Sequence, residues 1–234
     1  MFCLVRTEPE ASKHAGISYL LIDMKQPGID VRPLKQMTGT SEFCEVFFDN
    51  VKTPKDWIVG KRGEGWLVSR TTLKHERNSI GSTQQTRAAL KGLVALARET
   101  KIGGRPAIED AAIRQRLATL EGYVRSHHYS GYRTLTRDAK GESPGPITMM
   151  NKIISTNIGH EVAKLALDLL GDEGMLDATG AGMTGMLGGG RAWISQYMYS
   201  LGIAVAGGTA NIQRNVIGER ALGLPRDAAA QRSA

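Results

Sequence analysis

Apolar segments rich in β-formers occupy the first part of the chain and predict short strands. We expect strands over Phe2–Val5, Ile17–Met24, Ile29–Leu34 and Phe43–Val51, because each is bounded by turn residues or by proline. Apolar and polar residues alternate in Ile29–Leu34, as they do in a strand with one buried face. Since no helical pattern separates these segments, we expect them to pair in antiparallel fashion.

From Trp66 onward, apolar residues recur at helical spacing nearly to the end of the chain, which predicts successive helices. Glycine-rich separators at 103–106, 141–146, 171–190 and 207–208 divide them. Long helices joined by modest loops form an antiparallel bundle. The positions that share helical faces are Leu90, Leu93, Val94 and Ala97; Ile113, Leu117, Leu120 and Val124; Ile154, Ile158, Val162, Leu165 and Leu169; Ile194, Tyr197, Met198, Leu201 and Val205; and Ile212, Val216 and Ile217.

Together the two patterns predict an α+β protein that is mostly α-helical. A partial antiparallel β-domain over residues 1–60 precedes an antiparallel four-helix-type bundle over residues 61–234. Four strands that open at Met1 leave sheet edges unpaired and an apolar face uncovered. We therefore expect the beginning of the β-domain to be missing from this chain.

Composition and charge exclude several classes of protein. The formal net charge is +7 over 234 residues, but basic and acidic residues are interspersed, which favours an anionic small ligand over nucleic acid. No segment approaches the roughly 18 uninterrupted apolar residues of a membrane span. The N-terminus does not have the pattern of a signal peptide. Cys3 and Cys44 form neither a disulfide framework nor a metal spacing, so we expect a cytoplasmic protein.

Two motifs suggest chemistry that their context does not support. The segment 180–185 (GAGMTG) matches the dinucleotide fingerprint, but no strand precedes it, so we interpret it as an interhelical loop. The pairs His75-Glu76 and His127-His128 do not repeat the Glu-x-x-His spacing of a di-iron bundle. We therefore expect no metal site and interpret these histidines as ordinary helix residues.

The segment Gly207-Gly208-Thr209 begins a turn into a last helix, which we expect from Thr209 to Leu222. Two glycines before a threonine N-cap leave backbone N–H groups with little bulk around them. This arrangement favours close approach of a ligand oxygen or a planar ring; a plain interhelical turn is the alternative. Glu76, early in the first long helix, is by itself typical of a solvated charge paired with a neighbour.

Taken together and in this order, these segments resemble the acyl-CoA dehydrogenase family. Residues 16–66 are similar to the second half of its β-domain, and residues 207–226 (GGTANIQRNVIGERALGLPR) to its closing signature. The resemblance implies that FAD-dependent dehydrogenation converts an acyl-CoA to a trans-2-enoyl-CoA. A carboxylate removes the α-proton while a hydride leaves for the flavin, and electrons then pass to an electron-transfer flavoprotein. It also implies an oligomer, a homomeric or heteromeric dimer of dimers.

The resemblance assigns roles to individual residues. Most members of the family carry the catalytic glutamate just before the Gly-Thr pair, where this chain has Gly207. A minority place it on the first long helix before an arginine, where this chain has Glu76 and Arg77. We therefore expect Glu76 to be the general base and Arg77 and the backbone N–H of Gly207 to bind the substrate. The expected FAD-binding residues are Gly208, Thr209 and Asn211.

Several flavin contacts of the family are replaced here by acidic residues. Glu99 aligns with an arginine that reaches the neighbouring subunit's FAD, and a glutamine of the family falls near Asp110. The Gln-x-x-Gly-Gly-x-Gly turn becomes 168–174 (DLLGDEG), whose acidic side chains would repel a pyrophosphate. The departures suggest a subunit that serves its own flavin but not its partner's, as in a heteromeric assembly with fewer flavins than subunits.

Two other functions stay open at the level of the sequence. One is a catalytically silent structural subunit of a heteromeric dehydrogenase, and the other is an acyl-CoA oxidase that passes electrons to dioxygen. The acyl chain is not defined by these residues, although a base at Glu76 hints at branched, long or polycyclic acyl groups.

Overall fold

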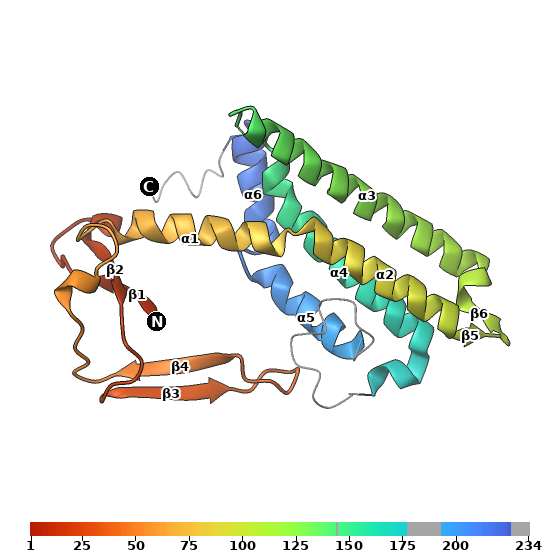
Figure 1. Ribbon diagram of the computed structural model, residues 1–234, viewed down its shortest axis with the longest axis horizontal. Coiled ribbons are helices and arrows are strands. Elements are labelled where there is room, and N and C mark those ends of the chain that lie inside the picture. The colour runs from red at the N-terminus through yellow and green to blue at the C-terminus, as the bar shows by residue number, and fades with distance from the viewer. Residues whose placement is uncertain (144, 177–192, 226–234) are drawn as a thin grey trace. The chain divides into compact units, whose positions relative to one another are not determined.

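The computed structural model describes residues 1–143, 145–176 and 193–225 (Figure 1). The chain divides into two compact units, Met1–Glu76 and Arg77–Ala234, and each is described by itself. The division falls inside helix α1 (Gly65–Ile80), whereas the proposed domain boundary near residue 61 stays a prediction.

Four strands form two antiparallel hairpins in the first unit. β1 (Phe2–Arg6) pairs with β2 (Ile17–Leu21), and β3 (Ile29–Leu34) pairs with β4 (Phe43–Phe48). The predicted segments and their antiparallel pairing are confirmed, although β2 and β4 each end three residues before the predicted end. The hairpins are two separate two-stranded sheets, so each strand keeps an edge that is not paired with another named strand.

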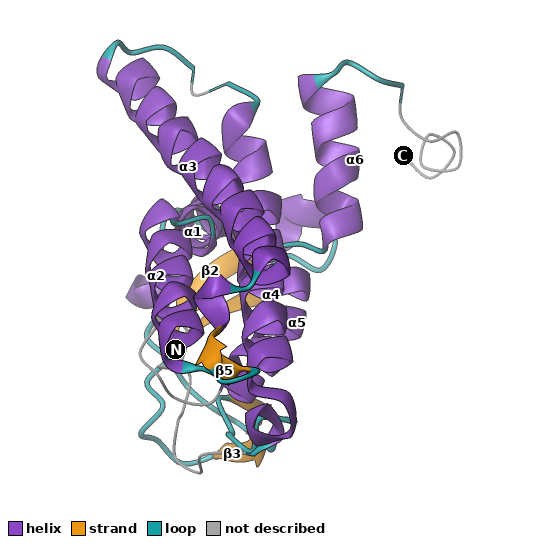
Figure 2. Ribbon diagram, turned by 90° about the vertical axis from the view of Figure 1, so that its right-hand side faces the viewer, coloured by secondary structure: helices purple, strands orange, loops and turns teal. Residues whose placement is uncertain are grey.

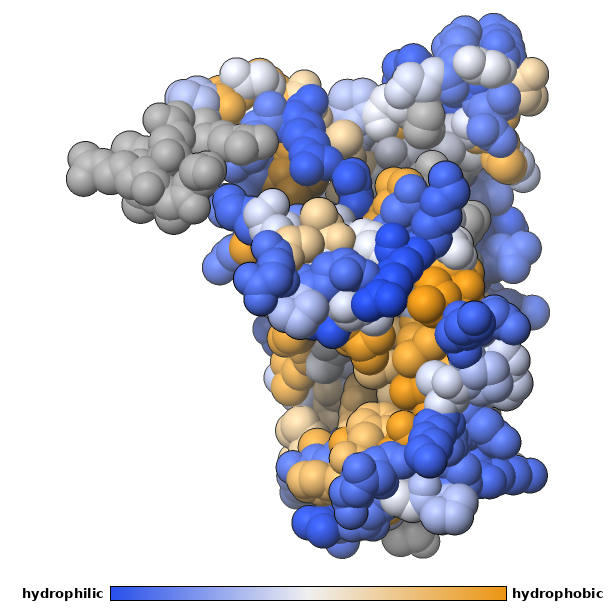
Figure 3. All heavy atoms as spheres, turned by 90° about the vertical axis from the view of Figure 1, so that its left-hand side faces the viewer, coloured by the Kyte–Doolittle hydropathy of each residue, from blue (hydrophilic) through white to orange (hydrophobic). Residues whose placement is uncertain are grey.

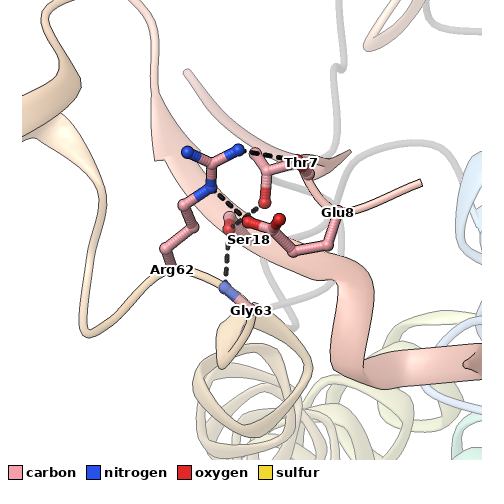
Figure 4. Close-up of polar contacts among 5 residues, drawn as sticks. All are labelled: Thr7, Glu8, Ser18, Arg62 and Gly63. Carbon is pink, nitrogen blue, oxygen red and sulfur yellow. Dashed lines mark hydrogen bonds and ion pairs between the residues drawn. The ribbon is translucent and has the colours of Figure 1, made fainter. Parts of the chain in front are cut away.

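A polar network joins the first hairpin to the turn before α1 (Figure 4). The hydroxyl oxygens of Thr7 and Ser18 lie 2.6 Å apart, and the backbone N–H of Gly63 donates to Ser18 Oγ at 2.9 Å. Arg62 donates to the carbonyl of Thr7 at 2.8 Å and forms an ion pair with Glu8. Because Ser18 is fully buried, its hydroxyl needs such partners, and the network connects the turn at residues 62–63 to the first hairpin.

Much of the apolar surface of the first unit is exposed. In β1, exposed Phe2 and Leu4 alternate with half-buried Cys3 and Val5. Large exposed apolar residues also occur on the other strands, and Figure 3 shows apolar side chains gathered on the surface. Apolar surface of this extent is typical of a face that another element or chain covers.

Four helices of the second unit pack into a bundle, in which α4 contacts the other three (Figures 1 and 2). They are α2 (Thr83–Glu99), α3 (Ala111–Ala139), α4 (Ile147–Leu170) and α5 (Trp193–Val205). The predicted fold class, mostly α-helical with small antiparallel sheets before a four-helix-type bundle, is confirmed. Val94, Ile113 and Ile154, which the helical pattern also predicted, are partly buried against the core. The predicted positions that are buried in it are Leu90, Leu93, Ala97, Leu117, Leu120, Val124, Ile158, Val162, Leu165 and Leu169.

Two features of the second half of the chain differ from the expectation: a break in a helix and an additional hairpin. The long helical segment after Trp66 is divided, because α1 ends at Ile80 and α2 begins at Thr83. At the break, Gly81 is buried against α4, and a Cβ there would lie 3.1 Å from Asn151 Cβ. A small hairpin also forms where a loop was expected. Its strands are β5 (Lys101–Ile102) and β6 (Arg105–Pro106).

The predicted apolar face of α5 is only partly correct. Ile194 is buried, as expected, but Leu201 and Val205 are exposed. Trp193 and Ser200 are buried instead, so the inward face of α5 is rotated away from the predicted stripe.

A last helix, α6 (Ala210–Ala221), also packs against α4. Short 3₁₀ helices connect the longer elements. They are η1 (Lys13–Gly16), η2 (Lys55–Trp57), η3 (Ala107–Glu109) and η4 (Gly171–Met175). Within the described ranges, no helix has the length and apolar character that crossing a bilayer requires.

Candidate functional site

The candidate site is the turn between α5 and α6. Gly207 and Gly208 adopt φ angles of 64° and 98°, a region that glycine occupies readily and other residues avoid. A Cβ on Gly208 would also lie 2.6 Å from Gln213 Nε2. Backbone conformation and close approach therefore both favour glycine at position 208.

The turn is joined to the start of α6 by two side chains. Thr209 is the N-cap of α6, as predicted, and its hydroxyl accepts a hydrogen bond from the N–H of Ile212 at 3.3 Å. Gln213, which is buried, donates Nε2–H to the carbonyl of Gly207 at 3.0 Å. These bonds make the glycines and the first turn of α6 one locally ordered segment.

A buried lysine of α4 holds the same turn, and sequence reasoning missed it. Lys152 is 2% exposed, and its Nζ donates to the carbonyls of Ala204 and Gly208, each at 2.9 Å. Burial lowers the pKa of the Lys152 amine. The available signal was that Lys152, Ser155 and Thr156 are polar and lie on the helix face that also carries apolar Ile158 and Val162. All three are buried.

The start of α6 is suited to an anionic group. Backbone N–H groups and the positive end of the helix dipole point out of the N-terminus of a helix. Asn211 is exposed in this first turn, and its Oδ1 accepts a hydrogen bond from Arg214 at 3.1 Å. The small glycine surface, the cap hydroxyl and the Arg214 guanidinium together suit an anionic ligand.

The sequence had suggested that Glu76 lies early in a long helix. In the structure it lies near the end of α1. The difference arises because the predicted long helix is broken at Gly81, so that α1 ends at Ile80. The side chain of Glu76 is exposed, whereas that of Arg77 lies outside the described part of the chain. The structure brings Gly207, Gly208, Thr209 and Asn211 together in one turn. Glu76 belongs to the other unit.

Two of the acidic departures have structural partners in the bundle. Asp110 is the N-cap of α3, and its Oδ1 accepts from the N–H groups of Ala112 and Ile113 at 2.9 and 3.0 Å. Asp168 forms an ion pair with Arg116 at 2.8 Å. The other departures are Glu99 at the end of α2 and Asp172 and Glu173 in η4.

The pair His127-His128 lies on α3. His127 is fully buried on α3, and its Nδ1 lies 3.2 Å from Thr86 Oγ1. Among the residues that the structure describes, no three His, Cys, Asp or Glu side chains gather as ligands for a metal ion. The glycine-rich segment 180–185 lies outside the described residues.

Comparisons with known proteins show the family to which the chain belongs. Residues 63–222 match the family described as acyl-CoA dehydrogenase, C-terminal domain. The chain is 38% identical over 229 residues to acyl-CoA dehydrogenase IpdE1 of Mycobacterium tuberculosis. The match covers 97% of this chain and 56% of that protein. It is 31% identical over 224 residues to acyl-CoA dehydrogenase FadE34 of the same organism, covering 96% of this chain and 29% of that protein.

A solved structure, the ChsE4–ChsE5 complex from Mycobacterium tuberculosis, matches with a TM-score of 0.77 and 27% identity. The match covers 97% of this chain and 57% of that chain. The present chain thus spans about half the length of IpdE1 and of this structural neighbour. On the family match and these relatives, the chain belongs to the acyl-CoA dehydrogenase family.

Proposed function

We propose that this chain forms the C-terminal part of a FAD-dependent acyl-CoA dehydrogenase, which converts an acyl-CoA thioester to a trans-2-enoyl-CoA. Family membership supports the proposal. The observation that carries it is the α5–α6 turn, where two glycines with positive φ lead into a threonine-capped helix. Such a turn offers backbone donors in a fixed geometry at a place where negative charge can develop.

In this proposal Glu76 is the general base that removes the α-proton of the acyl-CoA. Negative charge then develops on the thioester carbonyl oxygen, and the backbone N–H of Gly207 stabilises it by donating a hydrogen bond. Arg77 holds the acyl-CoA or orients Glu76. Gly208, Thr209 and Asn211 would hold FAD, which would supply the acceptor for the hydride from the β-carbon. An electron-transfer flavoprotein is the proposed final acceptor.

The substitution Glu76→Gln in the full-length protein tests the base. Anaerobic bleaching of the flavin absorbance would be followed after addition of isobutyryl-CoA, octanoyl-CoA, palmitoyl-CoA and a CoA thioester of a steroid side-chain acid. We expect the variant to keep its FAD and to bleach about 100-fold to 10,000-fold more slowly, because the base is lost. The control is Glu161→Gln, an exposed glutamate on α4, which should bleach at the wild-type rate.

The same experiment separates the proposal from a silent structural subunit. If Glu76→Gln bleaches as fast as the wild type, Glu76 is not the base and the silent-subunit alternative gains support. An acyl-CoA oxidase would instead consume dioxygen and release hydrogen peroxide while the bleached flavin recovers in air. Electron transfer to an added electron-transfer flavoprotein, without peroxide, is the result expected for a dehydrogenase.

We further propose an oligomer, a dimer of dimers with two kinds of subunit. The acidic residues at positions 99, 110, 168, 172 and 173 support it, because they stand where the family has flavin contacts. The ChsE4–ChsE5 structure is a complex, and this chain is similar to one of its chains. A cytoplasmic location is also proposed, in line with two free cysteines, Cys3 and Cys44.

A further inference from the structure

The ammonium group of Lys152 links α4 to two points of the candidate site. Nζ donates to the carbonyl of Ala204 in the last turn of α5 and to that of Gly208 in the turn itself, both at 2.9 Å. These residues lie 52 and 56 positions away in the sequence. The lysine therefore ties a glycine turn, which has little side-chain packing of its own, to a central helix of the bundle.

The charge of Lys152 is compensated by carbonyl dipoles. In the described part of the chain, no ion pair includes this residue. The carbonyl of Ala204 belongs to the last turn of α5, where carbonyls lack helical partners and a cation is favourable. A buried cation without a carboxylate is nevertheless costly compared with an apolar side chain of similar size. Packing alone is therefore a poor explanation for a lysine here.

The hydrogen bonds to the carbonyls also determine where the amides of the turn point. The described peptide bonds include no cis bond, and in a trans peptide the C=O and the N–H point in opposite directions. Since the carbonyl of Gly208 faces Lys152, the N–H of Thr209 points away from Lys152. Likewise, the carbonyl of Gly207 faces Gln213, so the N–H of Gly208 points away from Gln213.

We propose that Lys152 is a positioning residue for this site. By holding the carbonyls of Ala204 and Gly208, it fixes the segment between them, including Gly207, and aims the N–H groups of the turn at the negative charge of a ligand. Its own buried charge strengthens the donor character of that turn. The identity of the ligand, an acyl-CoA thioester with FAD, rests on the proposed function, whereas the ordering of the turn does not.

The test compares Lys152→Met, which removes the charge and keeps the length, with Lys152→Arg, which keeps the charge. Lys164→Met is the matched control, because Lys164 is an exposed lysine on the same helix. Amide hydrogen exchange of peptides covering residues 204–209 would be measured by mass spectrometry in the full-length protein. We expect exchange in Lys152→Met to be about tenfold faster there and unchanged in α2 and α3, with Lys152→Arg closer to the wild type.

A rate of exchange at 204–209 that is the same in Lys152→Met and the wild type would overturn the proposal. So would an increase of equal size throughout the bundle, since that indicates general destabilisation. If Lys152→Met does not fold, Lys152→Arg is compared with the neutral variant Lys152→Gln. Slow exchange at residues 204–209 in Lys152→Arg supports the proposal. Exchange there that is as fast in Lys152→Arg as in Lys152→Gln overturns it.

Kinetics add a measurement that a purely structural lysine would not affect. With the acyl-CoA set used for Glu76, we expect kcat of Lys152→Met to fall about tenfold with little change in KM, because the turn acts on charge in the transition state. An unchanged kcat contradicts this role. If the wild type bleaches with none of the acyl-CoA probes, the proposed function fails, and the exchange comparison still decides the role of Lys152.

Discussion

Lys152 and His127 are both buried in the bundle, and burial lowers the pKa of each. Lys152 reaches carbonyls far away in the sequence, whereas Nδ1 of His127 lies against Thr86. Neither contact could be predicted, because both depend on how separate helices cross. By contrast, Thr209 was predicted correctly as a helix cap, since a cap depends on residues within one turn of the chain.

His127 should make stability depend on pH. Burial is the main cause that lowers its pKa, the backbone of Gly81 raises it to a smaller extent, and His128 lowers it further. Between the lowered pKa and the ordinary value of about 6.5, the unfolded chain binds the proton more readily than the folded chain. The free energy of unfolding should therefore be level above that ordinary value and should fall as the pH decreases below it.

Urea unfolding at a series of pH values measures this effect. His127→Gln should remove the contribution of His127 to this decline. The control His128→Gln, at a half-buried neighbour, should keep most of the decline, because burial and not His128 is the main cause of the lowered pKa of His127. If the difference between His127→Gln and the wild type does not vary with pH, the assignment to His127 is wrong.

At the scale of elements, the sequence predicted the longer strands correctly from local patterns, but it did not predict features that depend on contacts between elements. Strands β1 to β4 were predicted because each carries its own β-rich segment and turn. The break between α1 and α2 was missed, although Gly81 and Ser82, the N-cap of α2, mark it in the sequence. The β5–β6 hairpin was missed because each strand has only two residues. The inward face of α5 was misjudged because Ser200, a polar residue, is buried.

Asp110 should stabilise α3 through its N-cap bonds. Asp110→Ala leaves the N–H groups of Ala112 and Ile113 without this acceptor, so we expect a loss of about 1 kcal/mol in the free energy of unfolding. Asp110→Asn keeps an acceptor oxygen and should lose much less. Chemical denaturation of both variants checks the expectation. Equal stability of Asp110→Ala and the wild type would show that the cap is not stabilising.

At the scale of the whole molecule, the family was recognised from two separated segments, residues 16–66 and 207–226, and the match over residues 63–222 confirms it. The structure likewise confirms small antiparallel sheets followed by a helical bundle. Relations between the units could not be predicted from local patterns. Glu76, the proposed base, and Gly208, Thr209 and Asn211, the proposed flavin contacts, belong to different units, and their joint role stays a proposal.

The acidic departures predict the flavin content of the assembly. If a subunit of this kind no longer supports its partner's cofactor, the purified full-length complex should contain about one FAD for every two chains. Flavin released by denaturation and measured by absorbance, divided by chain concentration, gives this ratio. A homomeric assembly with one FAD in every chain would contradict the heteromeric proposal and leave the dehydrogenase proposal intact.

The most direct test of the dehydrogenase proposal is the identity of the product. The full-length assembly, wild type and Glu76→Gln, would be incubated with the four acyl-CoA probes and an electron acceptor, and the thioesters would be analysed by mass spectrometry. We expect the wild type to convert a probe to the trans-2-enoyl-CoA, which lacks one hydrogen from each of the α- and β-carbons. Glu76→Gln should form little of it. If the flavin-loaded wild type desaturates no probe, or if Glu76→Gln desaturates one equally well, the account is contradicted.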